Sequence, residues 1–178
     1  MHGVGLVRGI NVGPTTRVAK SDLLAAFEGA GFSAVKTFLA SGNVVFDAKS
    51  VPGAVETKAV ENGIAERSGV SARVLLLAET EFRRIAKANP LLDDGDDFSK
   101  LMVTFLDGEI PGDVEHPDAA AIAPELVRFG DRAIYQWCPL GVSNSKLKLA
   151  FWRQVAGVAT GRNWRTVVKL LEELDARS

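Results

Sequence analysis

The sequence holds few of the residues that most often carry out chemistry in proteins. Of its 178 residues, one is a cysteine, two are histidines and one is a tyrosine. Cys138, as the single cysteine, excludes an internal disulfide and fits a reducing compartment. One cysteine with His2 and His116 is too small a set to predict a zinc site, which needs several such ligands close together. We therefore expect no metal and no cofactor.

Long apolar runs and a secretory leader are also missing. No apolar stretch approaches the ~20 residues that cross a bilayer. The start, Met1-His2-Gly3-Val4, has no basic region followed by an apolar core, as a signal peptide would have. We expect a cytoplasmic protein that does not bind a membrane.

A dominant charge is absent as well, because 21 basic and 22 acidic side chains leave a net charge of −1. The charges are unevenly distributed along the chain. Residues 1–78 carry +2, residues 79–124 carry −7 and residues 125–178 carry +4. No Asp or Glu occurs from Arg132 to Leu171, a stretch that we call the basic window. A segment of this kind attracts anions by Coulomb attraction.

The basic window also holds all three tryptophans and the only tyrosine. Grooves that bind nucleic acid combine cations for the phosphates with aromatic rings for stacking. Against this, Phe151, Trp152 and Trp164 fit the apolar faces of helices, so we expect these rings in the core. The basic side chains Lys146, Lys148, Arg162 and Arg165 then need another explanation.

Periodicity in the first half predicts the order βαββαβ, which is the split unit of a ferredoxin-like fold. Apolar runs that alternate with Gly, Ser and Asn indicate the strands, and apolar faces at helical spacing indicate the helices. The predicted strands are 4–8, 34–39, 44–46 and 71–78, and the predicted helices are 21–31 and 52–67.

This topology brings two motifs together. In a right-handed split unit the third strand lies antiparallel between the first two. The motif Arg8-Gly9-Ile10-Asn11-Val12-Gly13, which we call the RGINVG motif, ends the first strand. The motif Ser41-Gly42-Asn43, which we call the SGN motif, precedes the third strand, so both motifs should lie at one edge of the sheet.

The second half predicts a smaller α+β unit. Its expected strands are 100–106, 126–129 and 133–137, and its expected helices are 80–89, 117–123, one from Ser145 to about Val155, and one after Gly161. We interpret residues 157–161 as a linker and place the domains at 1–78 and 79–178.

The RGINVG motif matches neither a dinucleotide-binding loop nor a P-loop in its spacing. It is either an anion-binding loop or a strand-to-helix connection in which Asn11 bonds to nearby backbone. Arg8, at the end of an apolar strand, is either buried with a partner or held out to an anion. Ser41 lacks the G-x-S-x-G elbow of a nucleophilic serine, and neither histidine has an obvious route to it.

The chain resembles a known family. The segments LVRGINVG, GF..V.TFLASGNVVF, ANPL, SNSKL and ATGRNWRTVVKL follow the order typical of the bacterial domain-of-unknown-function 1697 family, from Leu6 to Leu170. The resemblance implies an α+β fold with a ferredoxin-like first half, and it implies no established reaction. The chain departs from the family at Pro14, where similar sequences usually carry a second glycine. The positions that match family motifs are Arg8, Gly9, Asn11, Gly13, Ser41, Gly42, Asn43, Ser145, Lys146, Leu147, Arg162, Asn163 and Trp164.

Three functional hypotheses follow. The first is a binding module for a phosphate-bearing ligand, nucleotide or nucleic acid, in which the edge with the RGINVG and SGN motifs faces the basic window across a cleft. The second is a metal-independent enzyme that acts on a small molecule with the same polar cluster, although Asp47 is the only carboxylate near the motifs. The third is that the motif residues are structural, as buried polar links between loops and helix starts. The candidate ligand-binding residues are Arg8, Asn11, Ser41, Asn43, Lys146, Arg162 and Asn163.

Overall fold

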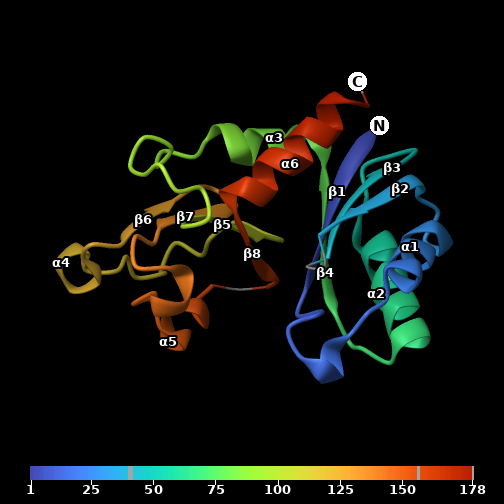
Figure 1. Cartoon of the computed structure of the whole chain (residues 1–178), viewed down its shortest axis with the longest axis horizontal. Helices are drawn as coiled ribbons and strands as arrows, with labels where there is room; N and C mark the ends of the chain where they lie inside the picture. The colour runs from blue at the N-terminus through green and yellow to red at the C-terminus, as the bar shows by residue number, and fades with distance from the viewer. Residues whose placement is uncertain (40–41, 156, 178) are drawn as a thin grey trace. The chain divides into compact units, whose positions relative to one another are not determined.

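The computed structural model describes residues 1–39, 42–155 and 157–177, which form two compact units. The first unit consists of residues 1–83 together with the segment that starts at Leu170, and the second consists of residues 84–169. The helix α6 (Trp164–Asp175) begins in the second unit and ends in the first (Figure 1).

The first unit has the ferredoxin-like topology that the sequence predicts. Its sheet has the strand order β2-β3-β1-β4, and each neighbouring pair is antiparallel. The predicted α+β fold and the central pairing of the first and third strands are therefore confirmed. The elements are β1 (His2–Arg8), a 3-10 turn (Pro14–Thr16), α1 (Lys20–Gly29), β2 (Ser33–Phe38), β3 (Asn43–Asp47), α2 (Ala54–Ser68) and β4 (Arg73–Ala78).

Helices α1 and α2 cover one face of this sheet (Figure 1). Between them and the strands lies an aromatic cluster, in which the ring centroids of Phe32 and Phe46 are 4.2 Å apart and those of Phe27 and Phe46 are 5.8 Å apart. Two glycines of β1 leave space for these rings. A Cβ atom on Gly3 would lie 2.6 Å from the Phe46 ring, and one on Gly5 would lie 2.5 Å from the Phe27 ring. The rings can therefore pack directly on the backbone of the central strand.

The opposite face of the sheet is also buried. Side chains alternate along a strand, so this face carries the apolar residues that the aromatic cluster does not include. Leu170 and Leu174 of the C-terminal segment are fully buried as well. An RNA-recognition domain uses this face of a ferredoxin-like sheet for bases, but here it is not accessible. Its side chains, each at most 3% exposed, are Val4, Leu6, Val45, Leu75 and Leu77.

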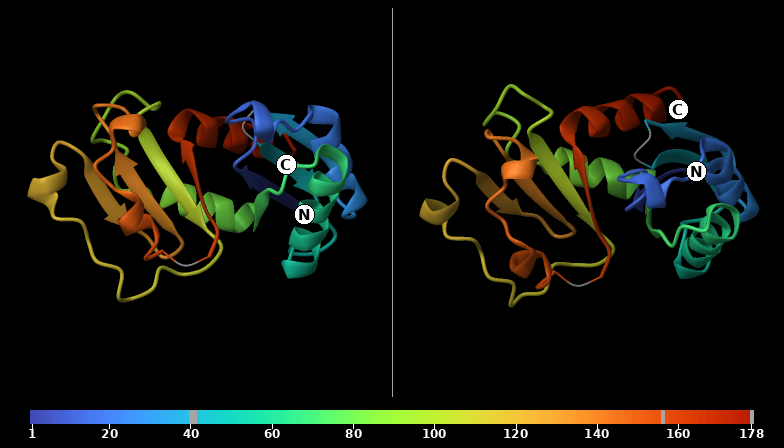
Figure 2. Two further views of the ribbon diagram at one scale, coloured as in Figure 1. Left: turned by 90° about the horizontal axis from the view of Figure 1, so that it is seen from below. Right: turned by 60° about the horizontal axis from the view of Figure 1, so that its bottom comes forward.

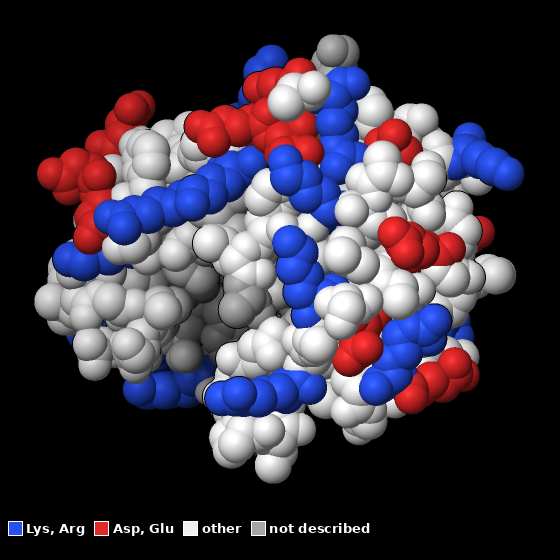
Figure 3. All heavy atoms as spheres, turned by 45° about the vertical axis from the view of Figure 1, so that its right-hand side comes forward, with Lys and Arg blue, Asp and Glu red and all other residues white. Residues whose placement is uncertain are grey.

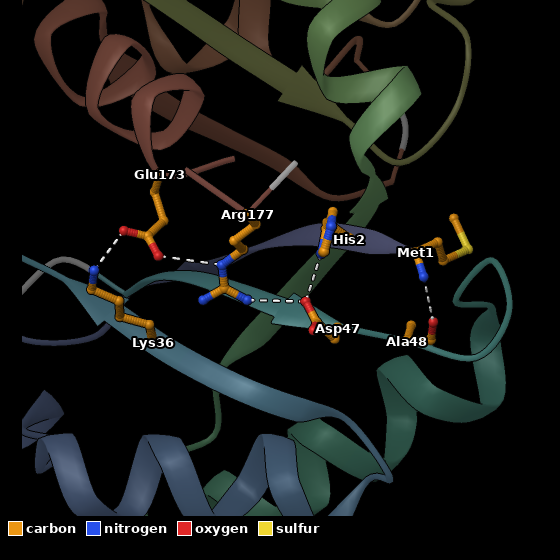
Figure 4. A network of polar contacts seen from close by, with 7 residues as sticks. All are labelled: Met1, His2, Lys36, Asp47, Ala48, Glu173 and Arg177. Atoms are coloured by element: carbon orange, nitrogen blue, oxygen red, sulfur yellow. Dashed lines mark hydrogen bonds and ion pairs between the residues drawn. The ribbon is translucent and has the colours of Figure 1, made fainter. Parts of the chain in front are cut away.

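Ion pairs tie the C-terminal segment to the strands of the first unit (Figure 4). Arg177 donates one hydrogen bond to Asp47 over 3.1 Å and another to Glu173 over 3.2 Å. Lys36 of β2 pairs with Glu173 at 2.5 Å, and the Nδ1 atom of His2 lies 2.6 Å from Asp47. We call these five residues the C-terminal clamp.

The second unit is built on another four-stranded antiparallel sheet, with the order β6-β7-β5-β8 (Figure 2). The buried side chains of β5 and β7, among them Val103, Phe105 and Tyr135, fill its centre. The helices and strands of the second unit are short. They are α3 (Glu79–Lys87), which begins in the first unit, β5 (Leu101–Leu106), α4 (Ala119–Ile122), β6 (Leu126–Phe129), β7 (Ala133–Trp137), α5 (Leu149–Trp152) and β8 (Ala159–Asn163).

Two predictions for the second half are wrong. The stretch interpreted as a linker contains β8, an edge strand that pairs with β5 from Ala159 to Asn163. Ser145 does not cap a long helix, because its hydroxyl donates to the buried Glu125 carboxylate over 2.8 Å. The chain instead makes a 3-10 turn at Val142–Asn144 and only one helical turn in α5.

Of the helices in the described part of the chain, none has both the length and the apolar character needed to cross a membrane.

Candidate functional site

The RGINVG motif and the described part of the SGN motif, Gly42 and Asn43, lie next to each other at one edge of the first unit's sheet. The amide of Val7 donates to the carbonyl of Gly42 over 2.8 Å, and Leu6 of β1 is paired with Asn43 of β3. Gly42 has a left-handed φ of 72°, and a Cβ atom there would lie 2.8 Å from the Cβ of Val7. Only glycine therefore brings the SGN turn this close to β1.

Asn11 shapes the loop that follows β1. It has a left-handed φ of 55°, and its amide donates to the carbonyl of Thr16 over 2.7 Å. Its side chain binds both backbone groups of Val18: Oδ1 accepts from the amide over 3.0 Å, and Nδ2 donates to the carbonyl over 3.4 Å. These bonds close the loop into a fixed turn before α1, as expected for an asparagine that bonds to backbone.

A pocket of about 930 Å³ opens between this loop, the start of α1 and the end of β2. Its basic part is formed by Arg17 and Lys20. Its apolar part includes Pro14, Val18, Leu23 and Leu39. Among the described residues that line it there is no carboxylate, histidine or cysteine, so it offers no evident acid or base for catalysis. The other lining residues are Asn11, Gly13, Ala19, Thr37 and Gly42.

The cations of the pocket are not neutralised by neighbours. The side chains of Arg17 and Lys20 make no hydrogen bond or ion pair with any residue that the structure describes, and the same is true of Arg8. Arg8 is exposed at the end of β1 but is not among the lining residues. The basic side chains at the pocket are therefore those of Arg17 and Lys20. Neither residue was predicted as a site residue.

The start of α1 adds to the positive character of the pocket. Ala19, the residue that precedes the helix, offers no side-chain acceptor to its first amides, and both Ala19 and Lys20 line the pocket. The amides at a helix start carry partial positive charge. Asp22, in the first turn, offsets part of that charge. On the side that carries α1 and α2, basic side chains stand apart with acidic ones among them, so no continuous basic surface forms there (Figure 3).

The remaining predicted residue of the first unit that the structure describes, Asn43, is completely buried. Its Nδ2 donates to the carbonyl of Phe38 over 3.1 Å, which fastens the β2–β3 connection. Ser41 lies outside the described residues.

The predicted residues of the second unit also bond to nearby protein groups. Lys146 donates from Nζ to the carbonyl of Ala123 over 2.5 Å. Arg162 is 8% exposed and donates to the hydroxyl of Thr160 over 2.8 Å, and burial lowers its pKa to about 10. Asn163 accepts from the amide of Thr166 over 3.0 Å, so it acts as the N-cap of α6.

The second unit also contains a polar cluster around Glu125 that the sequence analysis did not predict. Glu125 is 6% exposed, and its carboxylate accepts from Gln136 over 3.0 Å, from Ser145 over 2.8 Å and from the amide of Lys146 over 2.8 Å. Burial, together with the charge and hydrogen bond of Glu125, raises the pKa of the Cys138 thiol to about 12. The cluster is thus satisfied internally, and Cys138 stays a neutral thiol.

The missed cations had a signal in the sequence. Arg17 and Lys20 stand directly before the apolar helical pattern, where a basic side chain opposes the helix dipole. Such a placement has a small cost, which an anion bound at the helix start would offset.

Comparisons with known proteins agree with this fold. The family model described as "Protein of unknown function (DUF1697)" matches residues 1–135. Among solved structures, the conserved bacterial protein SP0830 from Streptococcus pneumoniae is similar over 98% of both chains, with a TM-score of 0.70 and 21% sequence identity. The curated proteins contain no match. At this identity the likeness to SP0830 shows a shared fold.

Proposed function

Because the chain belongs to the DUF1697 family, whose name assigns no activity, we propose a function from its own geometry: the first unit binds a phosphate-bearing ligand in the pocket beside the RGINVG and SGN motifs. The observation that carries the proposal is the pair Arg17 and Lys20, which line the pocket without a carboxylate among its described lining residues.

Electrostatics supports an anionic ligand. Two cations and the start of α1 border one cavity, and a phosphate group has the charge and the acceptor oxygens to meet all three. Arg17 presents a planar fork of donors and Lys20 a compact charge. Arg8 is exposed at the end of β1, and its charge adds to the electric field that attracts an anion to this edge of the sheet.

A structural role is the function that we propose for the motif residues that already bond to protein groups. Asn43 and Asn163 already bond to the backbone of the β2–β3 connection and of α6, and the Arg162 guanidinium bonds to Thr160. These contacts support fastening of turns and helix starts rather than ligand binding.

Binding of AMP, used as a probe phosphate monoester at low ionic strength, tests the proposal. In the double variant Arg17→Gln/Lys20→Gln we expect the dissociation constant measured by calorimetry to rise by about tenfold per cation, the factor that ~1.4 kcal/mol represents. The matched control is Lys49→Gln/Arg67→Gln, two exposed cations of the first unit that do not line the pocket. Wild-type protein that binds no AMP, or equal losses in both double variants, would contradict the proposal.

A further inference from the structure

The size of the pocket exceeds what a free phosphate ion needs. Its volume of about 930 Å³ lies in the range of roughly 300–1,000 Å³ that is typical for small organic ligands. A phosphate group at Arg17 and Lys20 would leave most of this space for another chemical group.

The lining divides into a basic and an apolar part. Arg17 and Lys20 form the basic part, whereas the buried side chains of Val18 and Leu23 form an apolar floor. Leu39, at the end of β2, adds an apolar wall. A ligand that fills both parts has a negatively charged end and a body that gains from leaving water.

Leu39 is a residue of the pocket lining whose large apolar side chain is exposed. Its side chain is 56% exposed, although a leucine stabilises a protein most when it leaves water. Its backbone has a left-handed φ of 55°, a conformation that is unfavourable for a non-glycine residue. A ligand body packed against Leu39 would bury the exposed part of its side chain.

Few polar groups in the lining remain available to form hydrogen bonds with the body of the ligand. The side-chain amide of Asn11 is already hydrogen-bonded to the backbone amide and carbonyl of Val18. The hydroxyl of Thr37 makes no hydrogen bond within the described part of the chain. The body is therefore held by contact area, with little discrimination between similar rings.

We propose that the ligand is an organic phosphate of the nucleoside monophosphate class, with the phosphate at Arg17 and Lys20 and the ring on Val18, Leu23 and Leu39. This inference rests on the proposed function and adds the chemical class. A nucleic-acid chain fits less well, because on the side that carries α1 and α2 basic side chains are interspersed with acidic ones and form no continuous track (Figure 3).

Four probes separate the possibilities when each is titrated into the full chain at low ionic strength: AMP, inorganic phosphate, adenosine and a single-stranded DNA of ten thymidines. We expect AMP to bind at least about tenfold more tightly than inorganic phosphate or adenosine, because only AMP engages both parts of the pocket. GMP should bind comparably to AMP.

The variant Leu39→Asn tests the apolar wall. Asparagine tolerates the left-handed backbone better than leucine, so the variant is expected to fold. We expect AMP to bind about fivefold more weakly, because part of one leucine's burial is lost, and the affinity for inorganic phosphate to stay unchanged. The matched control is Val55→Asn, an exposed apolar residue on α2 of the same unit that does not line the pocket.

The outcomes distinguish the two levels of the proposal. Equal affinities for AMP and inorganic phosphate, with no effect of Leu39→Asn, would overturn the nucleotide class and leave phosphate binding in place. Tighter binding of the thymidine decamer than of AMP would replace the small ligand by a nucleic-acid chain. If none of the probes binds wild-type protein, phosphate binding itself fails.

Discussion

At the scale of single residues, Gly42 is the position where the backbone leaves least choice. We expect Gly42→Ala to lower the free energy of unfolding by about 2–5 kcal/mol. The left-handed φ contributes ~1–2 kcal/mol of this and the overlap with Val7 a further ~1–3 kcal/mol. Urea unfolding followed by circular dichroism measures the change. Gly29→Ala, in α1 and with open space around it, is the control and should not destabilise.

Cys138 gives a second residue-scale prediction. Because burial and Glu125 raise the pKa of its thiol to about 12, very little thiolate exists at pH 8. We expect native protein to resist alkylation by iodoacetamide at this pH, and protein unfolded in guanidinium chloride to be labelled once per chain. Mass spectrometry after a timed reaction counts the labels. Native labelling at the rate of the unfolded chain would show that the thiol is accessible and ionised.

The same scale shows how far the sequence could predict a site. It identifies the edge that carries the RGINVG and SGN motifs, because strand order fixes which turns meet. The sequence does not show that Asn43 is fully buried, because the same sequence pattern is found for a turn asparagine that faces water and for one that bonds to backbone. Arg17 and Lys20 were missed because an exposed cation beside a helix is usually a solvated one. Only the folded chain reveals the cavity between them.

At the scale of secondary-structure elements, the C-terminal clamp should make the first unit sensitive to acid. Burial alone would raise the pKa of Asp47, but its hydrogen bonds to His2 and Arg177 outweigh burial and lower the pKa below the ordinary 3.8. Glu173 is likewise lowered below 4.5, where the bonds to Lys36 and Arg177 outweigh burial. A carboxyl group with a lowered pKa in the folded state stabilises that state above its unfolded pKa.

We therefore expect the clamp's contribution to be complete near neutral pH and to be lost as the pH falls below about 4.5 and through the lower folded pKa values. Thermal melts from pH 7 to pH 3 measure it. In Arg177→Gln the loss of melting temperature with acid should be smaller than in wild type, because two carboxyl partners lose the same cation. The control is Arg153→Gln, an exposed arginine of the second unit. Parallel curves for wild type and Arg177→Gln would refute the role of the clamp.

Strands with strong apolar patterns could be predicted from the sequence, and β8 could not. Its residues Ala159–Asn163 include a glycine and the polar side chains of Arg162 and Asn163, so local preference indicates a connection. The ladder with β5 supplies the hydrogen bonds that make this segment a strand. Pairing with a distant strand overrides the local preference here. The partner strand β5 lies too far away in the sequence for a local pattern to include it.

At the scale of the whole molecule, the first unit is assembled from both parts of the sequence. Residues from Leu170 onward belong to it together with residues 1–83. We expect a chain that stops after Lys169 to lose protection of the β1, β3 and β4 amides in hydrogen exchange, because the buried Leu170 and Leu174 and the ion pairs of the clamp are removed.

Amides of β5 and β7 should keep their protection in the shortened chain, since both strands belong to the second unit. The full-length variant Glu172→Gln, altered at an exposed position of α6, provides a control for a change of charge in the same segment. Unchanged exchange at β1 after shortening would show that residues 1–83 suffice for the unit.

The return of the chain to its first unit also sets an order of events during synthesis. A ribosome adds roughly 5–20 residues per second, and a domain usually folds as a unit once its last residue has emerged. Residues 1–83 emerge early, but Leu170 and Leu174 follow only after all of residues 84–169 have been made. Throughout that interval of several seconds, Val4, Leu6 and Val45 lack the C-terminal segment of their own unit. The nascent chain thus carries an uncovered apolar sheet face, and that is the stage at which a chaperone has most to bind.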